Sequence, residues 1–148
     1  MEELLKLFET LIGHLSKLTD LAKQKTITVR KNDLLELDRI LREEQAVALA
    51  LRGIDQKRTV LLQKLDLTHV TLTDLPAKAP KALQQKARET VENLRHAYQI
   101  YASAAEVARN TLECNLHEVE HFLAAAGADH WEGGTIEPPS QMKADFRA

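Results

Sequence analysis

The sequence has few of the residues that cross-link chains or interrupt helices. It contains one cysteine, five glycines and four prolines in 148 residues, and only 4% of its residues are aromatic. Because Cys114 is alone, no intrachain disulfide can form, and nothing favours an oxidising compartment. Leu and Ala dominate the apolar residues, which suits helices packed on helices better than a sheet built from β-branched and aromatic residues. We therefore expect an all-α fold.

An excess of charge of one sign is also absent, since 20 Lys and Arg face 22 Asp and Glu. A nucleic-acid partner would require clustered Lys and Arg to neutralise phosphates, so none is expected. No apolar run is long enough to span a bilayer, and the first residues carry acids where a signal peptide needs positive charge. These features predict a cytoplasmic protein without membrane insertion.

What the sequence does contain is one long apolar stripe between Lys81 and Gly127. Its members follow one another in steps of three and four, and so share one face of a helix. They are Leu83, Ala87, Val91, Leu94, Tyr98, Tyr101, Ala105, Ala108, Leu112, Leu116, Val119 and Leu123. At about 1.5 Å per residue the helix would be about 70 Å long, so it needs long partners. We expect Tyr98 and Tyr101 to lie in the core.

Two earlier helices, over residues 2–29 and 33–66, are predicted to supply those partners as an antiparallel hairpin. The β-branched residues 26–29 should fray the end of the first helix. Asp33 and Glu36 form a capping-box pattern for the second, in which Asp33 accepts from a backbone amide and Glu36 reaches back. Residues 67–80 read as a proline-bearing linker with a helical turn around residues 69–72.

The predicted architecture is an elongated antiparallel helical bundle over residues 1–127, made of the hairpin and a long amphipathic helix over about residues 81–126. Residues 128–148 are expected to form a flexible tail. Glu44 and Arg58 fall on or beside the apolar track of the second helix. Their side chains either reach water from the edge of the stripe or pair across helices, and we expect the edge arrangement because charges are seldom buried.

Residues 117–121 read HEVEH, a match to the HExxH motif of zinc enzymes. Helical projection from Leu112 places His117 and His121 on the side opposite the apolar stripe, where they face solvent. A catalytic zinc also needs a third protein ligand in an enclosed cavity, and Cys114 is the only neighbour that could be imagined in that role. We therefore predict no catalytic residues, no cofactor and no dedicated metal site, although incidental metal binding by these three residues stays open.

Three segments resemble the FlgN family of flagellar export chaperones. Residues 29–45, VRKNDLLELDRILREEQ, are similar to the family's turn and acidic second helix. Residues 54–65, IDQKRTVLLQKL, place Arg58 where the family tends to carry arginine, and residues 108–124, ARNTLECNLHEVEHFLA, place Asn110 at the family's asparagine position. The ending ADFRA is also similar to family tails, whereas HWEGG at residues 130–134 departs from them.

This resemblance implies a chaperone of the flagellar type III export system. Such a protein binds the C-terminal segments of hook-filament junction proteins, keeps them unassembled and delivers them to the export gate. The implied binding region is the C-terminal half of the long helix, and on its apolar face we expect the client to contact Leu112, Leu116, Val119, Phe122 and Leu123.

Two alternatives of different classes stay open beside the chaperone. One is a zinc-dependent hydrolase that uses HEVEH, and the other is a coiled-coil structural protein that self-associates through the same stripes. A monomer in solution favours the chaperone, whereas a tight dimer that buries the third helix favours the structural protein. A homodimer therefore remains possible.

We predict that titration of the purified protein with Zn²⁺ will reveal no site tighter than millimolar, because two exposed histidines lack a third ligand and an enclosing cavity. Replacing Glu118 with Gln should change no hydrolytic activity. A stoichiometric zinc ion that copurifies with the protein would contradict this prediction and favour the hydrolase.

Overall fold

The structure is a computed structural model that describes residues 1–127. Within this range the chain forms helices and no strands: α1 (Glu2–Arg30), α2 (Leu34–Lys64), α3 (Leu75–Lys78), a 3-10 turn (Lys81–Leu83) and α4 (Gln84–Ala125). The predicted all-α helical bundle is confirmed. The chain divides into two units, Met1–Asn115 and Leu116–Ala148. The expected tail, residues 128–148, lies outside the described residues.

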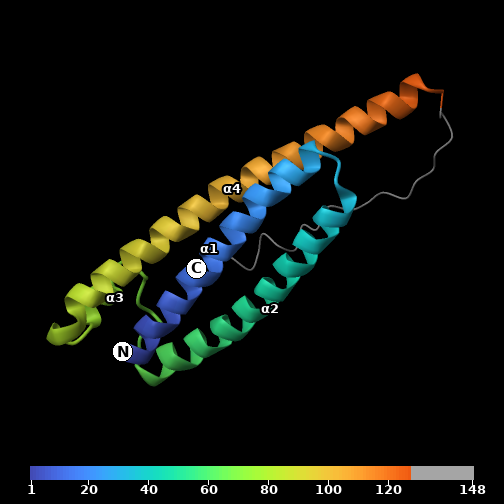
Figure 1. The fold of residues 1–148 in the computed structure, drawn as a ribbon. Coiled ribbons are helices and arrows are strands. Elements are labelled where there is room, and N and C mark those ends of the chain that lie inside the picture. Colours follow the sequence, from blue (N-terminus) through green and yellow to red (C-terminus); the bar gives the residue numbers. More distant parts are fainter. Residues whose placement is uncertain (128–148) are drawn as a thin grey trace. The chain divides into compact units, whose positions relative to one another are not determined.

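In the first unit, α1 and α2 form an antiparallel hairpin (Figure 1). The expected fraying of α1 at residues 26–29 is wrong, because the helix continues to Arg30. Thr26, Thr28 and Val29 are buried, and the Thr26 hydroxyl donates a hydrogen bond to the backbone oxygen of Ala22 at 3.1 Å. Burial against neighbouring helices outweighs the modest helix propensity of β-branched residues.

Asn32 makes the turn between α1 and α2 with a φ of 54°, in the left-handed region that Asn tolerates better than most residues. The backbone N–H groups of Asn32 and Asp33 donate to the oxygens of Val29 and Thr28, which is the Schellman arrangement of a helix end. Asp33 caps α2 as predicted, since its carboxylate accepts from the Glu36 amide at 3.2 Å. The other half of the expected capping box is missing, because Glu36 instead accepts from Arg39.

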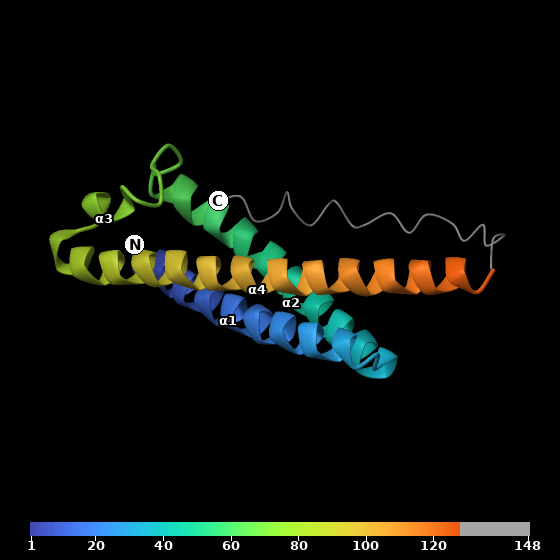
Figure 2. The ribbon, with the colours of Figure 1, turned by 90° about the horizontal axis from the view of Figure 1, so that it is seen from above.

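The linker between α2 and α4 contains α3 at residues 75–78, and not the helical turn expected at residues 69–72 (Figure 2). The Thr71 hydroxyl accepts a hydrogen bond from the Asp74 amide, which holds a turn just before α3. Pro76 follows in the first turn of α3, where a missing N–H costs nothing. Leu75 and Pro76 are buried, so this short helix closes one end of the core.

One buried cluster of the first unit joins α1, the linker and the first half of α4, while α2 adds the buried residues Ile40, Val47, Leu51 and Ile54. Its fully and mostly buried members are Leu4, Leu5, Phe8, Leu15, Leu67, Leu75, Ala79, Ala87, Val91 and Leu94. Tyr101 is half-buried against this cluster as expected, whereas Tyr98 is 39% exposed and the prediction that it lies in the core is wrong. Apolar spacing placed both tyrosines on one stripe, but the neighbouring helices cover only part of its width.

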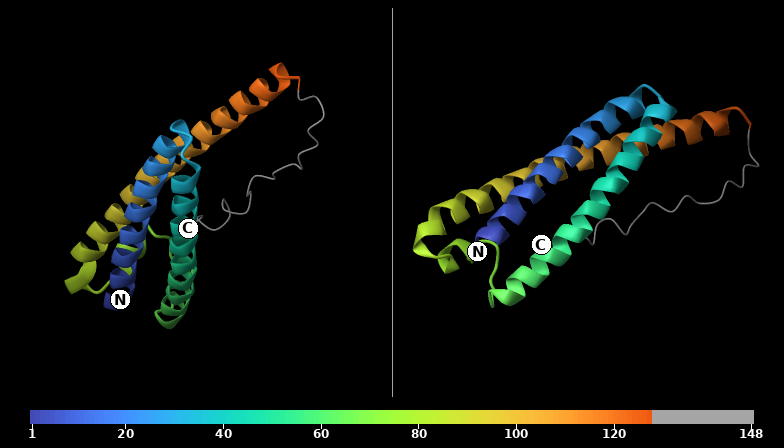
Figure 3. Two further views of the ribbon diagram at one scale, coloured as in Figure 1. Left: turned by 45° about the vertical axis from the view of Figure 1, so that its right-hand side comes forward. Right: turned by 60° about the horizontal axis from the view of Figure 1, so that its bottom comes forward.

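Two contacts define the direction of α4 within the first unit. Near the start of α4, the Lys86 ammonium lies 3.5 Å from the Glu9 carboxylate. Near the α1–α2 turn, the Asn115 amide donates to the Val29 backbone oxygen at 3.4 Å and to the Asn32 side-chain oxygen at 3.2 Å. This part of α4 therefore runs parallel to α1 and antiparallel to α2 (Figure 3).

A polar cluster links the helices away from the apolar core. The Lys25 ammonium of α1 lies 3.0 Å from the Glu44 carboxylate of α2, and both side chains are less than one-fifth exposed. Burial and the nearby Glu44 carboxylate raise the pKa of Tyr101 on α4. The edge arrangement expected for Glu44 is wrong, since it pairs across helices, whereas Arg58 is partly exposed and pairs within α2 with Asp55 at 2.6 Å.

We predict that Glu44→Leu will lower the free energy of unfolding by about 1–3 kcal/mol, because Lys25 then keeps its charge in a largely buried site without a partner. The double variant Lys25→Met, Glu44→Leu should recover most of that loss, since apolar side chains replace both charges. Urea unfolding of the wild type, both single variants and the double variant measures the coupling. Single variants as stable as the wild type would contradict the prediction.

Gly13 offers a second test of stability. An added Cβ at Gly13 would meet nothing within 4 Å, so Gly13→Ala keeps every contact of α1 and removes the entropic cost of a helical glycine. Thermal or urea unfolding should show a gain of about 0.5–1 kcal/mol. Gly127→Ala is the contrasting variant, because Gly127 has a φ of 77° that Ala adopts only with strain. A loss of stability in Gly13→Ala would show that this part of α1 is not helical.

Candidate functional site

The residues predicted to bind a partner all lie on α4. Leu112 is near the end of the first unit and is half-buried. Leu116, Val119, Phe122 and Leu123 belong to the second unit. Their exposed fractions are 52% for Leu116, 47% for Val119 and 72% for Phe122, while Leu123 is half-buried.

The described part of the second unit is the last portion of α4, and it ends with a regular helix terminus. The Ala126 amide donates to the Phe122 oxygen at 3.0 Å, and the Gly127 amide donates to the Ala124 oxygen at 3.2 Å. Gly127 then takes a φ of 77°, a conformation that favours glycine. The helix thus holds Leu116, Val119 and Leu123 at intervals of three and four residues, so their side chains share one face.

This face is apolar and substantially open to water, and we call Leu116, Val119, Phe122 and Leu123 the distal apolar face. Single exposed apolar residues are common on soluble proteins, whereas several adjacent ones mark a surface that binds another molecule. These four side chains bind through hydrophobic contact, and the exposed Glu120 lies one turn after Leu116 beside them. The distal apolar face can hold an apolar segment of a partner, and it offers no group for catalysis.

The HEVEH motif does not assemble a site in the part of the chain that the structure describes. His117, Glu118 and His121 are all exposed, and Cys114 is an exposed free thiol. Among residues 1–127, no group of three or more His, Cys, Asp or Glu side chains is placed to hold a metal ion. Within residues 1–127 the motif therefore has the sequence of a zinc site without a third ligand placed beside it.

The family resemblance singled out two residues, Arg58 and Asn110, and neither belongs to the distal apolar face. Arg58 pairs with Asp55, and its Nε is buried without a hydrogen-bond partner in residues 1–127. Asn110 is exposed on α4. No hydrogen bond or ion pair within residues 1–127 joins Arg58 to Asn110, so the two residues form no shared site there.

Sequence reasoning missed Asn115, which joins α4 to the α1–α2 turn through Val29 and Asn32. No signal in the sequence could have revealed this contact, because it depends on which residue of α4 meets the turn. Sequence reasoning also missed three exposed apolar residues outside the long stripe, Ile27, Ile100 and Val107. The sequence did carry a signal for these three residues, because each is apolar and lies outside the apolar stripe of its helix.

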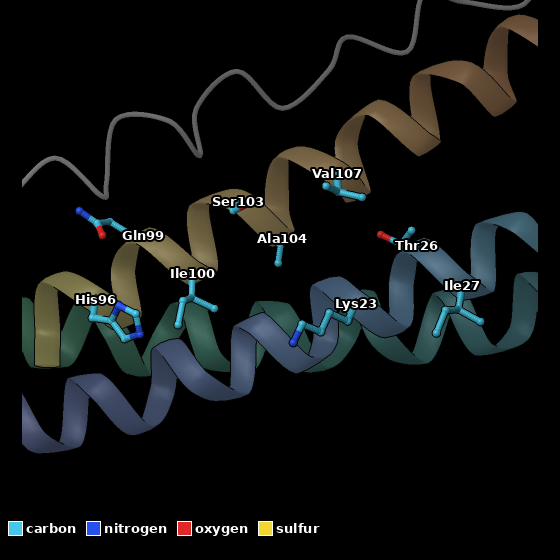
Figure 4. Close-up of a pocket in the computed structure, with 9 residues that line it drawn as sticks. All are labelled: Lys23, Thr26, Ile27, His96, Gln99, Ile100, Ser103, Ala104 and Val107. Carbon is cyan, nitrogen blue, oxygen red and sulfur yellow. The ribbon is translucent and has the colours of Figure 1, made fainter.

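These three residues help to line a groove of about 670 Å³ between α1 and α4, within the first unit. In Figure 4, Ile100 and Ala104 point from α4 toward α1. The remaining lining residues are Lys23, Thr26, His96, Gln99 and Ser103. We call this feature the α1–α4 groove.

Comparison with known proteins identifies the chain. A family model described as FlgN protein matches residues 1–130, most of the sequence. The chain belongs to the FlgN family. No curated protein and no solved structure gives a significant match to it.

Membership of the FlgN family makes the protein a flagellar export chaperone and confirms the resemblance found in the sequence. FlgN proteins are a chaperone family, and a chaperone needs a surface that holds another protein. The distal apolar face and the α1–α4 groove are therefore the features most relevant to this FlgN chain. None of the helices in residues 1–127 is both long enough and apolar enough to cross a membrane.

Proposed function

We propose that this FlgN chaperone binds the C-terminal segments of hook-filament junction proteins in the cytoplasm, keeps them unassembled and delivers them to the type III export gate. The family supplies the general activity, and the residues proposed to contact the client are the distal apolar face together with Leu112. The proposal makes the protein a carrier and assigns no catalytic step to it.

One observation carries this proposal: the distal apolar face is exposed although it is apolar, with Phe122 open to water over 72% of its surface. If α4 ended in polar residues, water alone would satisfy its last turns and no partner would be needed to cover them. Keeping a phenylalanine, a leucine and a valine in water is unfavourable unless a partner covers them for part of the time. An amphipathic segment that lays its own apolar face on these residues is a recurring form of recognition between helices.

The energy available from this face suits a temporary complex. Burying one large apolar side chain completely contributes about 1.5–3 kcal/mol. The four residues of the distal apolar face are already partly covered, so each contributes less than this to binding. Because association itself costs about 4–15 kcal/mol, the face by itself gives weak binding, and a longer client segment must supply the rest. Reversible binding is what a chaperone that later releases its client requires.

Two glutamates on the distal apolar face should remove client binding. We predict that Leu116→Glu, Leu123→Glu will weaken binding of a labelled C-terminal peptide of a hook-filament junction protein by at least about tenfold, since central apolar contacts dominate such interfaces. Fluorescence anisotropy measures the affinity. Circular dichroism should show unchanged helicity, because Leu116 is exposed and Leu123 only half-buried.

The matched control is His117→Glu, His121→Glu, which adds the same two charges to exposed positions of the same helix segment. It should leave the affinity for the client peptide unchanged. Equal losses in both double variants would show that added negative charge, and not the apolar face, is responsible. A loss of helicity in the leucine variant would show that these leucines belong to a core, and the proposed site would then be wrong.

The solution mass of the same proteins tests the structural alternative. Sedimentation of a wild-type monomer agrees with an apolar face reserved for a client. A tight dimer that dissociates in Leu116→Glu, Leu123→Glu would instead show that a second copy covers this face, and the protein would be a self-associating coiled coil.

A further inference from the structure

We propose that the α1–α4 groove is a second docking site, which takes an acidic amphipathic helix from another protein. The groove lies entirely in the first unit, and its residues do not overlap with the distal apolar face. The inference does not depend on the proposed function, because it rests on the lining of the groove alone.

The floor of the groove is apolar and accessible. Ile27 is 53% exposed, Ile100 42% and Val107 49%, although all three are large apolar residues. Ile100, Ala104 and Val107 follow one another at intervals of four and three residues on α4 (Figure 4). This spacing matches the apolar positions of an opposing helix.

The small side chains and the volume of the groove favour a helix as the occupant. Between the larger side chains of α4 lie Ser103 and Ala104, whose small size leaves room for an incoming side chain. A volume of about 670 Å³ is enough for several apolar side chains, which is more than a single residue of an extended chain would place there. Gln99 and Ser103 add hydrogen-bonding groups along the same lining.

The charge of the lining decides which helix fits. Lys23 is the one residue of fixed charge in the lining, and His96 is the only other group that can become positive. No Asp or Glu lines the groove, and within residues 1–127 Lys23 has no ion pair. An acidic residue at one end of a bound helix would therefore meet a cation that has no partner, without facing a like charge.

The same charge argues against a second copy of this chain as the occupant. In a two-fold dimer the same patch faces itself, so the Lys23 side chains of the two copies would share one interface. The lining provides no carboxylate to separate or neutralise them. A partner with acidic groups avoids this repulsion, and self-association through the groove does not.

Two synthetic helical peptides test the proposal with the full-length chain. Both carry one apolar stripe, and they differ only in having Glu or Lys at the flanking positions. We expect the Glu peptide to bind at least about tenfold more tightly than the Lys peptide by fluorescence anisotropy at low salt, and we expect the difference to shrink as salt rises. Lys23→Glu should reverse the preference.

Ile100→Glu tests the apolar floor and should weaken binding of the Glu peptide at least about tenfold. Val60→Glu is its matched control, because Val60 is 48% exposed, lies on α2 and does not line the groove. Circular dichroism should show that both variants keep their helicity. Leu116→Glu, Leu123→Glu should bind the Glu peptide as the wild type does, so failure of the proposed client site would leave this result standing.

Three outcomes would overturn the proposal. Equal binding of the two peptides, or of the Glu peptide to wild type and Ile100→Glu, would show that the groove is not the site. No binding of either peptide at millimolar concentration would show that the groove takes no helix of this kind. A change of solution mass in Ile100→Glu would show that the groove is covered by a second copy.

Discussion

The apolar cluster between the beginning of α1 and the first half of α4 governs the rest of the first unit. Leu4, Leu5 and Phe8 meet Ala87, Val91 and Leu94, and the linker residues Leu67, Leu75 and Ala79 complete the cluster. These contacts bring the beginning of α4 against the beginning of α1. The pairs Lys86–Glu9 and Asn115–Val29 then follow along its length.

Apolar packing becomes sparse along α4 after this cluster. Beyond Leu94, Ala108 is the only residue of α4 within the described range that is fully buried. Farther along the first unit, the amide of Asn115 joins α4 to the α1–α2 turn, and the Lys25–Glu44 pair joins α1 to α2. Ile27, Ile100 and Val107 stay accessible in this part of the first unit, where they line the α1–α4 groove. The two surfaces proposed to bind partners lie outside this apolar cluster.

Much of the fold was predictable because it depends on local rules. The spacing of apolar residues predicted three long helices, Asp33 was correctly identified as the cap of α2, and HEVEH was correctly expected to face solvent. The errors arose where tertiary contacts outweigh local preference. Residues 26–29 remain helical because they are buried, and the short helix of the linker forms at Leu75–Lys78 where Pro76 and the turn before it allow one. Tyr98 is exposed because the other helices of residues 1–127 leave that side of α4 uncovered.

By itself the sequence determined the helical class, the helix order, the cap at Asp33 and the family, because each depends on residues close together in the chain or on their order. The candidate client residues were also chosen from sequence, and their role remains a prediction. Only the tertiary structure decided that Lys25 pairs with Glu44, that Asn115 meets the α1–α2 turn and that α1 and α4 leave a groove lined by Lys23 and apolar residues. These features depend on the register between helices, which is set by the packing of side chains far apart in the sequence.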